Sequence, residues 1–181
     1  MKVALFGKTR AGKDSVGDLL VNEYGFSKMA VGDGIKKIIE EFFPEALDNG
    51  KPRYHYQFIG QQLRKLNPDV WINDMIRRSE YIRIQNLIYR GEITNFVVAD
   101  GRQRNEVKKL REQGYTNVVM ETDETIRIER MRQLGDKFSL EMLRHETELE
   151  VARIEPDYII NNNGTLEDLK IKVRELLNEL R

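Results

Sequence analysis

The sequence contains no cysteine, and its apolar residues never run for more than four positions in a row. The absence of cysteine excludes a disulfide framework, a thiolate nucleophile and a zinc site built on cysteine. A helix that spans a membrane needs about 20 mostly apolar residues in succession, so the sequence predicts no such span. Charge of one sign is also lacking, because 30 lysines and arginines balance 30 aspartates and glutamates. No overall field therefore favours nucleic acid or an anionic membrane as a partner.

The length of 181 residues is enough for a single domain with a substantial hydrophobic core. The apolar pattern begins at Val3, which leaves no room for a signal peptide at the start of the sequence. We therefore expect one cytoplasmic domain that covers residues 1–181.

The start of the chain contains its most specific motif. A mostly apolar run, Lys2–Phe6, leads into a glycine-containing loop, which is followed by apolar residues at the spacing of one helix face, namely Val16, Leu19 and Leu20. The order of strand, glycine loop and helix is the context in which Gly-x-x-x-x-Gly-Lys forms a phosphate-binding loop, or P-loop. The glycines let the backbone wrap around phosphate oxygens, and the positive end of the following helix adds to the attraction. We predict that ATP is bound by Gly7, Lys8, Thr9, Arg10, Ala11, Gly12, Lys13, Asp14 and Ser15.

The residues that end the motif define the expected chemistry of the loop. Lys13 can reach the β- and γ-phosphates of ATP, and we predict that it is catalytic. The next position usually carries a serine or threonine whose hydroxyl binds magnesium, but here it is Asp14, and Ser15 follows. A carboxylate is a hard oxygen ligand for Mg²⁺, directly or through water, whereas its charge alone would stabilise the first helical turn. Both interpretations of Asp14 stay open, and Asp14 and Ser15 are the predicted magnesium ligands of the loop.

Apolar periodicity predicts that strands alternate with helices along the rest of the chain. The stretch 54–90 is expected to be largely helical with a break at Asn67–Asp69, and the expected strands after the first are 26–31, 96–99, 117–120 and 158–160. This alternation predicts an α/β fold, with a parallel five-stranded sheet and helices on both faces. It is the three-layer architecture of P-loop NTPases, with a helical insert over about residues 32–90. Ligands are expected at the carboxyl ends of the strands.

Charged residues follow the second and third predicted strands. Asp33 comes directly after the second strand, and Asp100 and Arg102 follow the third. In P-loop proteins an aspartate at such a strand end helps to organise magnesium, so we predict a metal-binding and catalytic role for Asp100; the alternative is a turn or helix-cap aspartate. Arg102 is placed for phosphate recognition, because its fork donates two parallel hydrogen bonds. The remaining helix arginines are interpreted as ordinary solvated residues: Arg77, Arg78, Arg83, Arg104 and Arg111.

Several short patterns, taken together, resemble the deoxynucleoside monophosphate kinases of phages. One is the Gly-Lys-Asp-Ser ending of the P-loop, which animal-type phosphomevalonate kinases share. The others are Gln57, Gly60, Arg64 and Trp71 on a helical stretch, Asp100-x-Arg102-x-x-Asn105-Glu106, Thr147-Glu148, and Asn162-Asn163-Gly164-Thr165-Leu166. The resemblance runs in order from about residue 3 to residue 177. It implies that an acceptor nucleotide is bound by Asp33, Lys36, Arg64, Trp71, Arg102 and Glu148. One departure is Asp33-Gly34-Ile35-Lys36, which lacks the proline of the Asp-Pro-Leu-Lys segment that it resembles.

The segment after the fourth predicted strand is rich in arginine. Related kinases carry there a mobile segment that closes over ATP, and we predict a lid at about residues 123–146. Arg127 and Arg130 share one helix face. We predict that Arg130 contacts the transferring phosphoryl group and that Arg127 binds ATP. The alternative is a solvated helix whose arginines form surface ion pairs worth about 0–1 kcal/mol each.

The sequence as a whole predicts a phosphotransferase that depends on ATP and Mg²⁺. Phosphate binding follows from the residues, whereas the resemblance implies a (deoxy)nucleoside monophosphate acceptor that is converted to the diphosphate. Two alternatives stay open: another small-metabolite kinase of the dephospho-coenzyme A or phosphomevalonate type, and a nucleotide-binding switch without turnover. The expected partners are small-molecule nucleotides, with no nucleic acid and no membrane, and the chain is expected to be a monomer or a homodimer.

Overall fold

The computed structural model describes residues 1–48, 50, 52–135, 150–151 and 153–181. Residues 1–28 and 95–181 form one compact unit, and residues 29–94 form a second. We call them the sheet unit and the helical unit. Within the described ranges, no helix combines the length and the apolar character that crossing a membrane requires.

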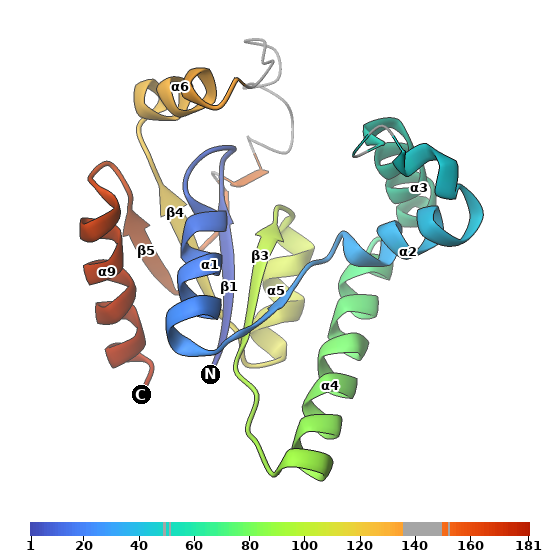
Figure 1. Ribbon diagram of the computed structural model, residues 1–181, viewed down its shortest axis with the longest axis horizontal. Coiled ribbons are helices and arrows are strands. Elements are labelled where there is room, and N and C mark those ends of the chain that lie inside the picture. Colours follow the sequence, from blue (N-terminus) through green and yellow to red (C-terminus); the bar gives the residue numbers. More distant parts are fainter. Residues whose placement is uncertain (49, 51, 136–149, 152) are drawn as a thin grey trace. The chain divides into compact units, whose positions relative to one another are not determined.

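The sheet is built from β1 (Lys2–Gly7), β2 (Ser27–Met29), β3 (Phe96–Gly101), β4 (Thr116–Glu121) and β5 (Tyr158–Asn161). The order of the five strands is β2-β3-β1-β4-β5 (Figure 1). β1 pairs in parallel with β3 and β4, and β4 pairs in parallel with β5. The central strands are buried along almost their whole length, because the apolar strands of a parallel sheet are covered on both faces. The predicted α/β fold with a parallel five-stranded sheet is confirmed.

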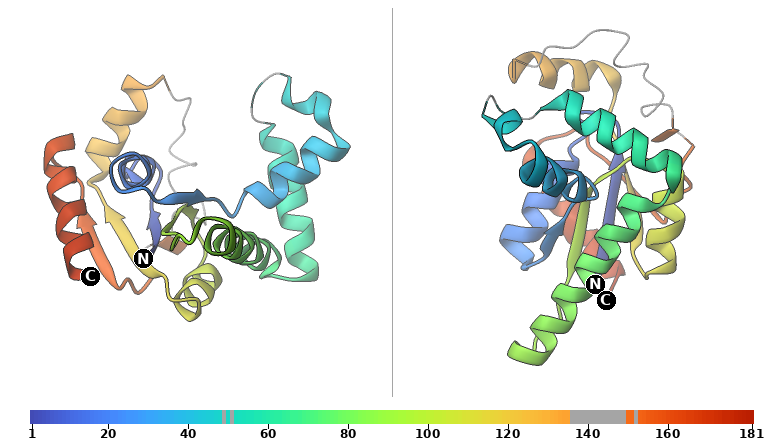
Figure 2. Two further views of the ribbon diagram at one scale, coloured as in Figure 1. Left: turned by 60° about the horizontal axis from the view of Figure 1, so that its bottom comes forward. Right: turned by 90° about the vertical axis from the view of Figure 1, so that its right-hand side faces the viewer.

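Helices of the sheet unit cover both faces of the sheet (Figure 2). They are α1 (Lys13–Tyr24), α5 (Arg104–Glu112) and α9 (Leu166–Glu179), and the unit has a further helix, α6 (Glu124–Gln133). α1 and α9 contact each other on one face, and α5 packs against β4 from the other face. α6 lies beyond the carboxyl end of β4, at the same edge as the loop between β1 and α1 (Figure 1). The candidate site is therefore at the carboxyl edge of the sheet.

The core of the sheet unit follows from the alternation of side chains along each strand. Val3 and Leu5 of β1 lie in the core cluster that α1 and α9 cover, where Leu20 and Leu176 have no exposed surface. Phe6, which points to the opposite face of the sheet, is also fully buried. Burial of this apolar area stabilises the unit by roughly 25 cal/mol for each Å² removed from water. The P-loop thus starts from a strand that is rigidly packed on both sides.

The helical unit contains α2 (Asp33–Phe42), the short 3₁₀ helix η1 (Pro44–Leu47), α3 (Arg53–Leu66) and α4 (Val70–Arg90). The predicted break at Asn67–Asp69 separates α3 from α4 and is confirmed. Asp69 occupies the N-cap position of α4 without a side-chain cap hydrogen bond; its N–H donates to Oδ1 of Asn67 at 2.9 Å. The indole N–H of Trp71 donates to the carbonyl oxygen of Gly60 at 3.0 Å and ties α4 to α3.

Candidate functional site

The loop between β1 and α1 has a backbone that requires its two glycines. Gly7 and Gly12 have positive φ angles of 152° and 101°, where a side chain is strained. A Cβ atom on Gly7 would lie 2.9 Å from the carbonyl oxygen of Met120, and one on Gly12 would lie 2.1 Å from Nδ2 of Asn162. Both positions thus need glycine for two reasons: the backbone conformation, and the lack of room for a side chain. The room is lacking because the loop packs directly against Met120 of β4 and Asn162 after β5.

Lys13 folds back over this loop. Its Nζ donates to the carbonyl oxygens of Gly7 at 2.5 Å and Lys8 at 3.0 Å. A hydrogen bond between an ammonium and a phosphate oxygen is stronger than one to a neutral carbonyl, because both partners are charged. The lysine is therefore held beside the loop in a position from which a bound phosphate would attract it.

Arg127 and Arg130 reach the same loop from α6. The side chain of Arg127 is buried, and its NH1 donates to the carbonyl oxygen of Thr9 at 3.2 Å. Arg130 donates from NH1 to the carbonyl oxygen of Arg10 at 3.4 Å. The alternative of a solvated helix does not hold for Arg127, whose exposed fraction is 1%. Together with Lys13, these arginines gather three cationic side chains around one loop, which suits a polyanionic ligand.

No match is found among protein-family models or among curated protein sequences. Solved structures, however, resemble the chain along nearly its whole length. TT1252 from Thermus thermophilus has a TM-score of 0.60 at 18% identity, with 100% of this chain and 98% of that chain covered. A gluconokinase from Sinorhizobium meliloti 1021 has a TM-score of 0.60 at 20% identity, with 99% and 92% covered. A dephospho-CoA kinase from Campylobacter jejuni has a TM-score of 0.54 at 19% identity, with 99% and 98% covered. The chain therefore has the same fold as these two kinases.

The predicted magnesium ligands come from the first turn of α1 and the end of β3. Asp14 and Ser15 are exposed, and Asp100 is half-buried. Among the described residues, no three His, Cys, Asp or Glu side chains cluster in a way that could hold a metal ion. The donors nevertheless fit Mg²⁺, which keeps several waters and uses one or two carboxylates together with substrate phosphates. Asp14, Ser15 and Asp100 stay the predicted ligands of the ion, whose charge would offset that of the phosphates.

Asp100 lies at an irregularity in the register of β3. Between the pairs Ala4↔Val98 and Phe6↔Gly101, β1 advances by two residues and β3 by three. The extra residue of β3 falls at Ala99 or Asp100, and such a bulge changes the direction in which a side chain points. A Cβ atom on Gly101 would lie 2.6 Å from the ring of Phe6. The close packing of Gly101 on Phe6 therefore fixes the strand end that carries Asp100.

Arg102 is exposed at the turn between β3 and α5. The carboxylate of Glu106, which is 4% exposed, accepts the backbone N–H groups of Arg102 at 2.8 Å and Gln103 at 3.0 Å. A buried carboxylate needs such donors, because burial of an unpaired charge is costly. Glu106 thus holds the turn that presents Arg102, and the contact of Arg102 with an acceptor phosphate stays a prediction.

The other predicted acceptor-binding residues that the structure describes belong to the helical unit. Lys36 forms a 3.1 Å ion pair with Glu40, and this hydrogen bond raises the pKa of Lys36. Arg64 is half-buried near the end of α3. Trp71 is only 4% exposed, which gives its indole a packing role, and its contact with a substrate stays a prediction. The sequence pattern located Trp71 correctly on a helix but could not reveal which way its ring points.

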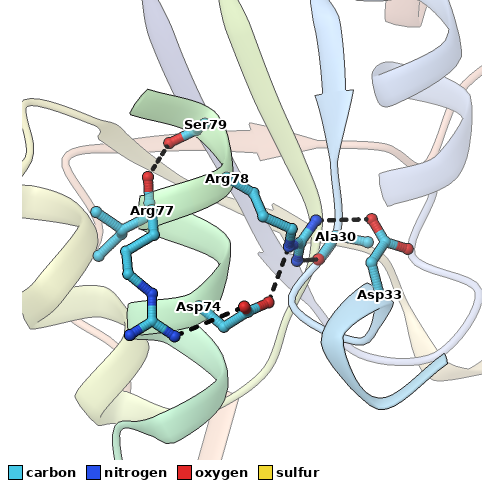
Figure 3. Close-up of polar contacts among 7 residues, drawn as sticks. Ala30, Asp33, Asp74, Arg77, Arg78 and Ser79 are labelled. Carbon is cyan, nitrogen blue, oxygen red and sulfur yellow. Dashed lines mark hydrogen bonds and ion pairs between the residues drawn. The ribbon is translucent and has the colours of Figure 1, made fainter. Parts of the chain in front are cut away.

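Arg78 is the main correction in the helical unit. It was expected to be solvated, but its side chain is 16% exposed. Its three nitrogens donate to Oδ2 of Asp74 at 2.8 Å, Oδ2 of Asp33 at 3.2 Å and the carbonyl oxygen of Ala30 at 2.7 Å (Figure 3). The i, i+4 spacing of Asp74 and Arg78 was a visible signal for the first contact. Arg78 therefore fixes Asp33, one of the predicted acceptor-binding residues, against α4.

The same network explains the glycine that replaces the proline of the resembled segment. A Cβ atom on Gly34 would lie 2.7 Å from Oδ2 of Asp74 and 3.0 Å from the ring of Trp71. The start of α2 can approach α4 closely only because this residue has no side chain. The departure from the family pattern is thus a local packing requirement.

Two residues that contact the P-loop had no assigned role in the sequence. Oγ1 of Thr122 and Nδ2 of Asn162 each donate to the carbonyl oxygen of Ala11 at 3.0 Å. The signal for Asn162 was its place in the pattern that follows the last strand, whereas Thr122 had none. Glu148 and residues 136–146 of the predicted lid lie outside the described residues, and their roles stay predictions.

Proposed function

We propose that this chain is an ATP-dependent phosphotransferase that converts a (deoxy)nucleoside monophosphate to the diphosphate. The observation that carries the proposal is the gathering of Lys13, Arg127 and Arg130 around one glycine loop at the carboxyl edge of the sheet. Phosphoryl transfer needs little covalent chemistry from the protein. It depends on alignment of the two substrates and on positive charge around the transferring group.

Each of these side chains has a distinct part in the proposed reaction. The loop and Lys13 hold the β- and γ-phosphates of ATP. Arg130 is only half-buried, so its guanidinium is accessible to the transferring group, whereas the buried Arg127 is fixed against the loop. Charge placed in advance of the reaction stabilises the transition state without reorganisation.

The acceptor is the finer part of the proposal. It is supported by the resemblance to phage deoxynucleoside monophosphate kinases. It is also supported by the placement of Asp33 at the start of α2 and of Arg102 directly after β3. An aspartate such as Asp33 suits hydroxyl groups as a hydrogen-bond acceptor, and an arginine such as Arg102 suits a phosphate. Both groups are present in a nucleoside monophosphate.

An assay of ADP release tests the proposal. The purified chain is incubated with ATP, Mg²⁺ and single acceptors: the nucleoside and deoxynucleoside monophosphates, dephospho-coenzyme A, phosphomevalonate, gluconate and shikimate. We expect release of ADP that depends on one or a few of the monophosphates. Activity with one of the other acceptors would keep the phosphotransferase and replace the acceptor. Nucleotide binding without ADP release in the whole panel would favour a nucleotide-binding switch.

A further inference from the structure

Consecutive carbonyl groups of the P-loop are held from outside the loop by side chains. Arg127 donates to the carbonyl oxygen of Thr9, and Arg130 donates to that of Arg10. The carbonyl oxygen of Ala11 accepts two hydrogen bonds of 3.0 Å, one from Thr122 and one from Asn162. The donors come from α6 and from the residues that directly follow β4 and β5. The shape of the loop is thus imposed by neighbouring elements.

The direction of a carbonyl group also sets the direction of the next N–H group. In a trans peptide the C=O and the N–H lie in one plane and point in opposite directions. When the C=O of Ala11 is held toward Asn162, the N–H of Gly12 points away from it. A loop that binds anions depends on N–H groups that point to a common side. Orientation of this peptide is therefore part of the binding site.

Asn162 is the residue where these contacts meet. The residue is 6% exposed, and its backbone N–H donates to the carbonyl oxygen of Glu121 at 2.7 Å. Its own carbonyl oxygen accepts from NH2 of Arg130 at 3.0 Å. Asn162 thus contacts the Ala11–Gly12 peptide through its side-chain amide. Through its backbone carbonyl it contacts Arg130, which is expected to meet the phosphoryl group. The group that faces the carbonyl of Ala11 must be a donor, and the amide nitrogen of Asn162 meets this requirement.

We propose that Asn162 is a positioning residue of the nucleotide site: its side-chain amide orients the Ala11–Gly12 peptide toward the phosphates, and its backbone carbonyl orients Arg130. This inference rests on the proposed function, since it assigns Asn162 a part in the binding of the same nucleotide. Asn162 touches no reacting atom in this account. It acts through the loop and through Arg130.

The test compares Asn162→Ala and Asn162→Asp with Asn161→Ala, a matched control whose exposed side chain lies one residue earlier on the same strand end. The Kd for ADP with Mg²⁺ is measured by isothermal titration calorimetry. We expect Asn162→Ala to weaken binding about tenfold, as loss of one buried hydrogen bond does, and Asn161→Ala to leave the Kd unchanged. In turnover assays of Asn162→Ala, the KM for ATP should rise more than the KM for the acceptor.

The aspartate variant supplies a readout that a purely structural role would not move. At about pH 8 the carboxylate of Asn162→Asp has no proton to donate, whereas at about pH 5 part of the population is protonated and can donate to Ala11. The ratio of the variant's Kd to the wild-type Kd should therefore fall as the pH is lowered. The ratio for Asn162→Ala should stay constant.

The possible failures can be told apart. Wild-type affinity in both Asn162 variants would overturn the positioning role and leave the proposed function standing. Affinity lost only in proportion to a lower Tm, with no recovery of Asn162→Asp in acid, would also overturn it. A wild-type chain that binds no nucleotide would overturn the proposed function, and the inference with it.

Discussion

Asp14 lies in the first turn of α1, directly after the lysine of the P-loop, and its side chain is exposed. Its carboxylate is placed to serve either as a magnesium ligand or as a charge at the positive end of the helix. Asp14→Asn keeps the size of the side chain and removes its charge. We expect the Mg²⁺ concentration for half-maximal turnover to rise about tenfold, while the helix-terminus effect on stability stays at about 0.3–1 kcal/mol.

The measurement is a magnesium titration of turnover, with thermal unfolding recorded in parallel. Asp18→Asn is the control, because Asp18 is an exposed aspartate one turn further along α1 that pairs with Lys28 at 2.8 Å. An unchanged titration curve in Asp14→Asn, with only a lower Tm, would leave Asp14 as a helix-terminus charge.

Single residues of the site differ in how far the sequence could reveal them. The order of strand, glycine loop and helix around residues 7–13 was predicted correctly, because the motif is local and its spacing is fixed. Asn162 and Ala11, in contrast, are 151 positions apart in the sequence. Contacts over such separations follow from the order of strands in the sheet. The side chains that contact the loop could be named only once the structure had shown that β1 and β4 are adjacent in the sheet.

The N-terminus of α9 is capped by a reciprocal set of hydrogen bonds between Thr165 and Asp168. Oγ1 of Thr165 accepts the N–H of Asp168, and the carboxylate of Asp168 accepts the hydroxyl and the N–H of Thr165. The hydrogen bonds that Asp168 accepts lower its pKa below the usual 3.8. The bond from the Thr165 hydroxyl has the largest effect, and the bond from the Thr165 backbone N–H comes next. Because the folded state lowers this pKa, the carboxylate adds stability that is fully present above pH 3.8 and is lost as the pH falls through the lower, folded-state value.

We therefore expect Thr165→Ala to reduce the free energy of unfolding by about 0.5–2 kcal/mol at neutral pH, the usual loss for a helix N-cap. The difference in stability between the wild type and Asp168→Asn should shrink as the pH is lowered from about 5 to about 3. Urea unfolding at several pH values measures both effects. Glu167→Gln is the control for charge alone, since Glu167 lies in the same turn and is exposed. A pH-independent difference for Asp168→Asn would contradict the cap.

α6 carries arginines whose burial and contacts could not be predicted from the sequence. The arginines were predicted to belong to a closing lid, and the structure has Arg127 and Met131 of α6 buried. Arg130 contacts the loop while remaining half-exposed. Amphipathic spacing indicated that Arg127 and Arg130 share a face, but a buried arginine cannot be told from a solvated one by spacing alone.

We predict that Arg130→Ala lowers kcat by about a hundred- to a thousandfold with little change in Tm, because a charge next to the transferring group is lost while Arg127 still anchors α6. Hydrogen exchange across residues 124–133 should slow further when a bisubstrate analogue binds. Arg132→Ala, on an exposed position of the same helix, serves as the control. Unaltered kcat in Arg130→Ala, together with unchanged exchange, would mean that α6 takes no part in the reaction.

At the scale of the whole molecule, the predicted acceptor-binding residues are divided between two compact units. Arg102 belongs to the sheet unit, and Asp33, Lys36 and Arg64 belong to the helical unit. The sequence predicted the sheet and its helices well, because strand–helix alternation and the P-loop are local patterns. The side-chain network that surrounds Arg78 could not be predicted, since Asp33 lies 45 positions away.

Arginine-to-lysine substitutions test whether Arg64 and Arg102 each bind the acceptor. Arg64→Lys and Arg102→Lys keep the charge and lose the bidentate fork, so the KM for the acceptor should rise about tenfold while the KM for ATP changes little. Steady-state kinetics with each substrate varied in turn measures this, and Arg77→Lys is a matched control because the Arg77 side chain is 76% exposed. Equal effects on both KM values would remove these arginines from the acceptor site.

In the function that we propose, the γ-phosphoryl group of ATP is transferred at the P-loop of this chain to a nucleoside monophosphate. Phosphorus NMR tests it most directly, because the ATP γ-resonance and the β-resonance of a new diphosphate are followed in one sample with ATP, Mg²⁺ and the monophosphate acceptors. For the wild type we predict that the new β-resonance grows at the rate at which the γ-resonance disappears. Lys13→Ala, with its far-ultraviolet circular dichroism unchanged, should slow both by about a hundred- to a thousandfold. A γ-resonance lost only to inorganic phosphate, or equal rates in the wild type and Lys13→Ala, would contradict the account.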